Sequence, residues 1–124
     1  EWAEYLKRSQ DKERDGAVLM GWTGDNGDPD NFLAVLAGCA GVGGSNRANW
    51  CNEEFNNLVV KASKVSDIAE RTKLYEDAQV IFKKEAPWAT IAHSTTYVPM
   101  SKSVIDYKVD PLGSHRFDGV DLAE

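Results

Sequence analysis

The sequence lacks both a cluster of basic residues and a long apolar run. Its 14 lysines and arginines are scattered among 20 acidic residues, which leaves a formal net charge of −6 at pH 7. Nucleic acids and anionic membrane surfaces require clustered cations, so we expect neither as a partner. No apolar run approaches the ~20 residues of a transmembrane helix, so we also expect no insertion into a membrane.

Cysteine is scarce as well, because the chain has only Cys39 and Cys51. No CxxC motif or pair of histidines accompanies them, which argues against a zinc site. They flank a loop rich in glycine, asparagine and serine, residues 41–46, that could bring the two thiols together. The spacing alone leaves two interpretations open, a disulfide or two buried free thiols.

The chain has no initiator methionine and no signal peptide. It begins at Glu1 with a pattern typical of the middle of a helix, and its 124 residues suit one domain or part of one. We therefore expect a fragment or a trimmed chain, and the missing signal then carries no information about location.

Apolar residues recur at spacings of three and four in four stretches, and this spacing predicts four helices. Asp30, Asn52 and Asp67 are the expected N-cap residues. Gly38 and Pro87 are expected to end the second and fourth helices. The predicted helices cover residues 2–9, 30–37, 52–62 and 67–86.

Two short apolar runs predict buried strands. Ala17–Trp22 is continuously apolar and lies between glycines, which is typical of a strand covered on both faces of a parallel sheet. Trp88–Ala92 is expected to be a second such strand, whereas the proline within Tyr97–Met100 favours a sheet edge or a crossover. The order of elements predicts an α/β fold with a thin sheet, so we expect more sheet upstream of residue 1.

A loop dense in glycine and aspartate, residues 21–32, follows the first predicted strand. Open α/β sheets bind ligands in the loops that follow their strands, and a carboxylate beside an indole suits a cationic group such as an α-ammonium. Asp28 and Asp30 are better explained as turn and cap residues. For Asp25, which lies three residues beyond Trp22, ligand contact and turn capping both remain open.

The same loop could be considered as a calcium site, but its spacing argues against one. Counting from Asp25 places Asp30 where an EF-hand requires glycine, and Leu36 where it requires glutamate. The glycines of the chain match neither a dinucleotide fingerprint nor a P-loop. We therefore expect no metal and no cofactor.

Support for catalysis is thin. His93 follows the second predicted strand and precedes Ser94, but no G-x-S-x-G motif is present. His93 is therefore interpreted as a structural residue, His115 as a solvated one, and no catalytic residue is assigned. The tryptophans are expected to lie in the core rather than against a cofactor: Trp2, Trp50 and Trp88.

Three segments of the chain resemble bacterial periplasmic dipeptide-binding proteins, which belong to the peptide/nickel class of ABC-transporter substrate-binding proteins. The segments are Gly21–Phe32, Ile91–Thr95 and Val109–Gly113, and the Gly-Trp-x-x-Asp pattern is the most specific part. The resemblance implies a fold of two lobes that close on a ligand by hinge bending. It also implies that residues 1–103 form a C-terminal segment of one lobe and residues 104–124 form an extended tail.

The resemblance assigns roles to individual residues. It implies that Asp25 binds the α-ammonium of a dipeptide, that Trp22 forms a pocket wall, and that Gly21 and Thr23 offer backbone groups to the ligand. It also implies a Cys39–Cys51 disulfide, which an exported protein can keep. The basic residue for the carboxylate of the ligand is expected upstream of residue 1.

The function that the resemblance implies is that of a periplasmic receptor, not an enzyme, with a dipeptide and the inner-membrane permease of an ABC importer as partners. A related binder of longer peptides, haem or a metal chelate is the near alternative. A small α/β hydrolase or peptidase-like enzyme that uses Asp25 and His93 is the alternative from a different class.

Overall fold

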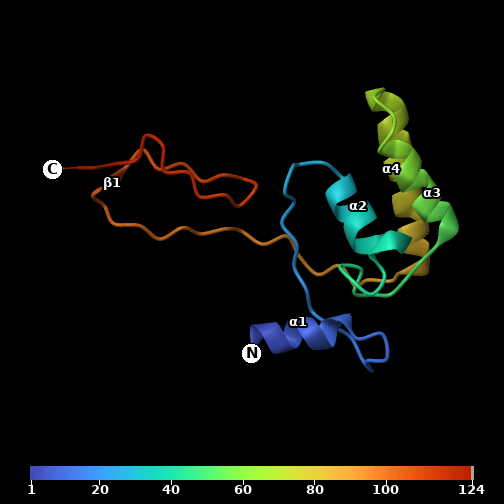
Figure 1. Ribbon diagram of the computed structural model, residues 1–124. Helices are drawn as coiled ribbons and strands as arrows, with labels where there is room; N and C mark the ends of the chain where they lie inside the picture. Colours follow the sequence, from blue (N-terminus) through green and yellow to red (C-terminus); the bar gives the residue numbers. More distant parts are fainter. Residues whose placement is uncertain (124) are drawn as a thin grey trace. The chain divides into compact units, whose positions relative to one another are not determined.

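The computed structural model describes residues 1–123, which form two compact units that divide between Ala89 and Thr90 (Figure 1). The first unit is helical and the second holds a small sheet. The expected partition into residues 1–103 and 104–124 concerns the lobes of a larger fold and stays a prediction. Among the described residues, no helix is long and apolar enough to cross a membrane.

All four predicted helices are present in the first unit. Helices α3 and α4 lie against each other, and α2 contacts α3 (Figure 1). A short 3₁₀ helix, η1, follows α2. The elements are α1 (Trp2–Gln10), α2 (Asp30–Ala37), η1 (Cys39–Gly41), α3 (Glu53–Ala62) and α4 (Ile68–Glu85).

Two of the three predicted N-caps are confirmed. The side chain of Asn52 accepts a hydrogen bond from the Phe55 amide at 2.9 Å, and that of Asp67 accepts one from the Glu70 amide at 2.8 Å. The prediction for Asp30 was wrong, because Asp30 is the first residue of α2 and makes no capping bond there. The carboxylate of Asp28 instead accepts from the Asp30 amide at 2.9 Å.

The core of the first unit lies between α3 and α4. Its buried side chains come from the two helical faces that the spacing predicts, with Ala37 added from α2. Burial of each large apolar side chain stabilises the fold by roughly 1.5–3 kcal/mol. The buried residues of the cluster are Ala37, Phe55, Val59, Ala62, Leu74, Tyr75 and Ala78.

Aromatic side chains extend this core beyond the two helices. The Trp50 ring packs edge-on against Phe55 and Phe82, at centroid distances of 4.9 and 5.7 Å. Trp88 packs edge-on against Phe82 at 5.2 Å but is exposed for 38% of its surface. The prediction that Trp2 belongs to the core was wrong, because it is 62% exposed and stacks on Tyr5 at the surface.

The two predicted buried strands are not formed within residues 1–123. Ala17–Trp22 and Trp88–Ala92 have no ladder partner there, and Leu19 is 72% exposed. The Tyr5 hydroxyl replaces a partner strand at one position, donating to the Leu19 carbonyl at 2.8 Å and accepting from its amide at 2.9 Å. An apolar run becomes a strand only when another strand pairs with its backbone groups, and the described residues supply none.

The second unit contains an antiparallel pair, β1 (Val104–Ile105) and β2 (Asp121–Leu122). Val104 pairs with Leu122 and Ile105 with Asp121. Between the strands the chain makes a long excursion in which the Tyr107 hydroxyl lies 2.7 Å from Nδ1 of His115.

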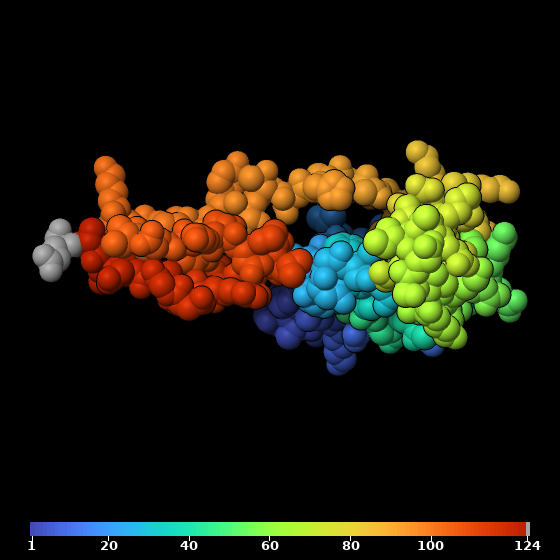
Figure 2. Space-filling model, turned by 90° about the horizontal axis from the view of Figure 1, so that it is seen from above, coloured from blue at the N-terminus to red at the C-terminus, as the bar shows by residue number. Residues whose placement is uncertain are grey.

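The second unit begins with an extended segment, residues 90–100. Figure 2 shows this segment in orange as a narrow strip. Its apolar side chains are exposed, Ile91 for 77% and Tyr97 for 83% of their surface. The segment makes no strand pairing within the described residues. Tyr97–Met100 is therefore not helical, but it forms no sheet edge with the described residues.

Candidate ligand-binding loop

Residues 21–31, named here the acidic loop, run from the end of the extended segment Ala17–Trp22 into the first turn of α2. Two of its turns are made by side chains that bind backbone amides: Asn26 accepts from the Asp28 amide at 3.0 Å, and Asp28 accepts from that of Asp30. Gly27 adopts a φ of 69°, which glycine reaches without strain. A Cβ on the buried Gly24 would meet the Phe32 ring at 2.8 Å, so a larger residue would require that ring to shift.

Asn31, in the first turn of α2, brings two of the predicted ligand residues together. Its Oδ1 accepts a hydrogen bond from the Trp22 indole nitrogen at 2.8 Å and one from the Asp25 amide at 3.1 Å. Its Nδ2 donates to Oδ2 of Asp25 at 3.0 Å. The indole and the carboxylate therefore share one amide as their common partner.

The other predicted contact residues lie at the surface of the same loop. Gly21, Thr23 and Asp25 are exposed, and Trp22 is 42% exposed. All four predicted contact residues therefore lie at the surface of the described part of the chain.

Arg71 of α4 anchors the acidic loop from behind. Its guanidinium lies 2.5 Å from Oδ2 of Asp28, donates to the Ala62 carbonyl at 3.3 Å and lies above the Tyr75 ring at 5.4 Å. The hydrogen bond from Arg71, followed by that from the Asp30 amide, holds the pKa of the Asp28 carboxyl below its usual range. Asp28 is thus a turn residue, as predicted, and it also forms an ion pair with Arg71 that was not predicted from the sequence.

Burial and charge act in opposite directions on Tyr75, which lies beside this ion pair. Burial is the largest effect and raises the pKa of the Tyr75 hydroxyl, although the hydrogen bond from Arg71 at 3.3 Å lowers it. The hydrogen bond to Asp28 is the main cause that raises the pKa of Arg71. A guanidinium in a protein keeps its charge, so Arg71 provides a lasting positive partner for Asp28.

The predicted Cys39–Cys51 disulfide is present, with an S–S distance of 2.08 Å. It ties the chain just after α2 to the start of α3. The buried side chain of Asn46 holds the enclosed loop, because its Nδ2 donates to the carbonyls of Gly38 at 3.1 Å and Trp50 at 2.8 Å.

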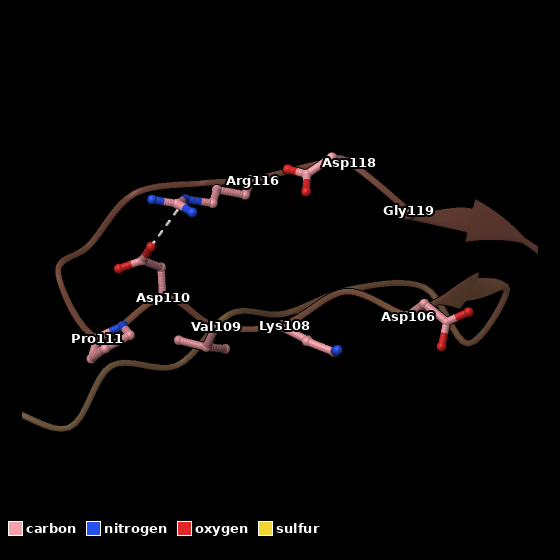
Figure 3. Close-up of a pocket in the computed structure, with 8 residues that line it drawn as sticks. All are labelled: Asp106, Lys108, Val109, Asp110, Pro111, Arg116, Asp118 and Gly119. Carbon is pink, nitrogen blue, oxygen red and sulfur yellow. Dashed lines mark ion pairs between the residues drawn. The ribbon is translucent and has the colours of Figure 1, made fainter.

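A separate hollow of about 400 Å³ lies in the second unit, between the two arms that run to β1 and β2 (Figure 3). Asp110 and Arg116 face each other across it at 3.4 Å. None of the predicted ligand residues lines it. The lining residues are Asp106, Lys108, Val109, Asp110, Pro111, Arg116, Asp118 and Gly119.

No group of three or more histidine, cysteine, aspartate or glutamate side chains within residues 1–123 is placed to hold a metal ion. Asp25 and His93, the two residues of the enzyme alternative, belong to different units.

Comparison with solved structures defines the class of the fold. A dipeptide-binding protein of Pseudoalteromonas sp. SM9913 in complex with Met-Leu matches with a TM-score of 0.87 and 34% identity, over 99% of this chain and 24% of that one. The periplasmic binding protein DppA of Helicobacter pylori, in complex with the peptide STSA, matches with a TM-score of 0.87 and 35% identity, over 100% of this chain and 25% of that one. The chain therefore has the fold of a part of a periplasmic binding protein.

Sequence comparison narrows the class further. The chain is 51% identical over 120 residues to di/tripeptide-binding protein 3 of Pseudomonas aeruginosa, covering 97% of this chain and 22% of that protein. It is 50% identical over 123 residues to the dipeptide-binding protein of Escherichia coli, covering 98% and 23%. Heme-binding protein A of Haemophilus influenzae is 45% identical over 122 residues, covering 98% and 22%. No family model matches the chain.

These relatives confirm the resemblance drawn from the sequence motifs. The chain is a homologue of one segment of the bacterial dipeptide-binding proteins, and it spans about a fifth of the length of the curated relatives it matches.

Proposed function

We propose that the chain is a segment of a longer periplasmic protein, the substrate-binding component of an ABC importer, and that the whole protein binds dipeptides. The observation that carries this proposal is the joint placement of the Trp22 indole and the Asp25 carboxylate by Asn31. Its support from relatives is that several proteins similar over nearly the whole chain are dipeptide-binding proteins, one of them solved with Met-Leu, and that a similar periplasmic binding protein was solved with the peptide STSA.

In this proposal Asp25 binds the α-ammonium of the dipeptide. Gly21 and Thr23 bind its backbone, which is a sequence-blind contact of the kind made when a peptide adds to a strand. Trp22 forms one wall of the pocket, where an aromatic ring supplies a large apolar surface and a polar edge. A closed cleft excludes water, so an ammonium left without its carboxylate there would cost about 3–5 kcal/mol.

A free amino terminus is therefore the feature that the site selects. The test is calorimetry on the full-length protein with a dipeptide and with the same dipeptide acetylated at its nitrogen. The free dipeptide should bind at least 100-fold more tightly, since about 1.4 kcal/mol corresponds to a factor of ten. Equal affinities for the two ligands would remove the ammonium role of Asp25.

A larger peptide or a haem is the alternative ligand, because one solved relative holds the peptide STSA and another relative, at 45% identity, is a heme-binding protein. Mass spectrometry of the ligand that copurifies with the full-length protein separates these cases. The permease of the importer is proposed as the partner because the class acts with one. Peptide hydrolysis that is abolished by His93→Ala would overturn the receptor proposal in favour of an enzyme.

A further inference from the structure

We propose that Asn31 is a positioning residue that sets the specificity of the site for a free amino terminus. This inference rests on the proposed function, because it assigns to Asn31 the orientation of the group that binds the ammonium. Asn31 is not offered as a contact of the ligand; it acts through Asp25 and Trp22.

The hydrogen bonds of Asn31 admit one orientation of its amide. Oδ1 faces two N–H donors, the Trp22 indole and the Asp25 backbone, while Nδ2 faces the Asp25 carboxylate. A flipped amide would place its NH₂ group against both donors and its oxygen against the carboxylate. The network therefore assigns the orientation of the amide, and every polar atom of the Asn31 side chain is used.

Asn31 can orient other groups because it stands on a fixed support. Its own amide donates to the Asp28 carbonyl at 3.1 Å, and Asp28 is held by Arg71. Farther along α2, Leu36 and Ala37 are buried, and the Cys39–Cys51 disulfide secures the chain that follows. A site built on a helix of this kind is positioned more accurately than one built on a free loop.

The contact with Asn31 leaves the carboxylate of Asp25 able to bind a cation. A carboxylate offers about four acceptor positions on two oxygens, and Nδ2 of Asn31 occupies one of them, on Oδ2. The exposed Asp25 side chain would otherwise sample several rotamers, and a ligand would have to order it on binding. Asn31 makes that ordering a property of the free protein.

The experiment measures the affinity ratio of a free dipeptide to its N-acetylated form, by calorimetry on the full-length protein. Asn31→Ala should weaken binding of the free dipeptide about tenfold, as expected for one ordered side chain set free. It should weaken the acetylated form less, because only the free dipeptide has the ammonium that Asp25 binds, so the affinity ratio should fall. Asn31→Asp should weaken the free dipeptide further, because it keeps the acceptors for Trp22 but turns an oxygen toward the carboxylate. Asn57→Ala, at an exposed position of α3, is the matched control and should change neither affinity.

Each outcome decides the inference. An unchanged affinity ratio in Asn31→Ala overturns it, whether neither affinity changes or both fall equally; an equal fall would show a general effect on folding. Circular dichroism of both Asn31 variants checks that each is folded. If one variant does not fold, the comparison with the wild type uses the other variant. Asp25→Asn is measured in parallel. If Asp25→Asn removes the discrimination and Asn31→Ala does not, only the role of Asn31 fails; if Asp25→Asn keeps it, the proposed function fails as well.

Discussion

Oδ2 of Asp28 lies 2.5 Å from Nη2 of Arg71, and the two residues are 43 positions apart in the sequence. This ion pair joins the acidic loop to α4. Asp28 contributes three contacts to the loop at once: it binds Arg71, its carboxylate caps the Asp30 amide, and its carbonyl accepts from the Asn31 amide. The position of the acidic loop therefore depends on the helical core behind it.

The pair predicts a loss of stability in acid. Because the pKa of Asp28 is lowered in the folded state, its contribution is fully present above the unfolded pKa of about 4. It is lost as the pH falls through the lowered folded pKa. The difference in free energy of unfolding between the wild type and Asp28→Asn should therefore shrink between pH 5 and pH 2. Urea unfolding at several pH values measures it, with Asp15→Asn, in the exposed loop after α1, as the control. A difference that stays constant with pH would contradict the pair.

If Asp25 binds the α-ammonium as proposed, Asp25→Asn should weaken dipeptide binding of the full-length protein by about 100-fold or more, because the ammonium would lose the carboxylate that pairs with it in a closed cleft. Calorimetry measures the loss. Asp30→Asn removes a carboxylate five residues away that starts α2, and it should change the affinity less than about twofold. Comparable losses in the two variants would indicate that the loop acts through its net charge rather than through Asp25.

Replacing both Cys39 and Cys51 with serine should lower the stability of the chain by roughly 3 kcal/mol in the chain-entropy description of a loop this short. The disulfide restricts the unfolded chain, and without it the loop held by Asn46 must be ordered from a larger set of conformations. Equilibrium unfolding with and without a reductant measures the effect. The reductant should reduce the stability of the wild type toward that of the double variant and should leave the double variant unchanged.

Phe55→Ala should lower the free energy of unfolding by about 3–5 kcal/mol, because the Phe55 side chain of α3 is fully buried in the core and packs against the Trp50 ring. That is a large part of the 5–15 kcal/mol typical of a small domain. Val80→Ala, on the exposed face of α4 where Val80 is 67% exposed, should change the stability by less than about 0.5 kcal/mol. Denaturant unfolding of the two variants compares them, and similar losses would show that the core lies elsewhere.

Helices could be predicted from the sequence because their signals are local. The i, i+3, i+4 spacing of Phe55, Leu58 and Val59 and the cap at Asn52 act within two turns, and both are found in α3. The strand prediction for Ala17–Trp22 was wrong for the residues described, because a strand needs a partner that can come from anywhere in the chain. The predicted cap at Asp30 was wrong because two nearby carboxylates could accept from the first amides of α2. The carboxylate that does so belongs to Asp28, two residues before the helix begins.

The acidic loop likewise has features that the sequence shows and contacts that only the tertiary structure shows. Its glycines, its acids and Trp22 are visible in the sequence, and their pattern resembles that of the dipeptide-binding proteins, whereas the role of Asp25 toward a ligand stays a prediction. The sequence does not show that Asn31 joins Trp22 to Asp25, because an asparagine six residues away from its partner is also typical of an ordinary turn. Nor does it show that Arg71 reaches Asp28. Those contacts depend on the path of the chain between the partners, and the packing of α2, α3 and α4 decides that path.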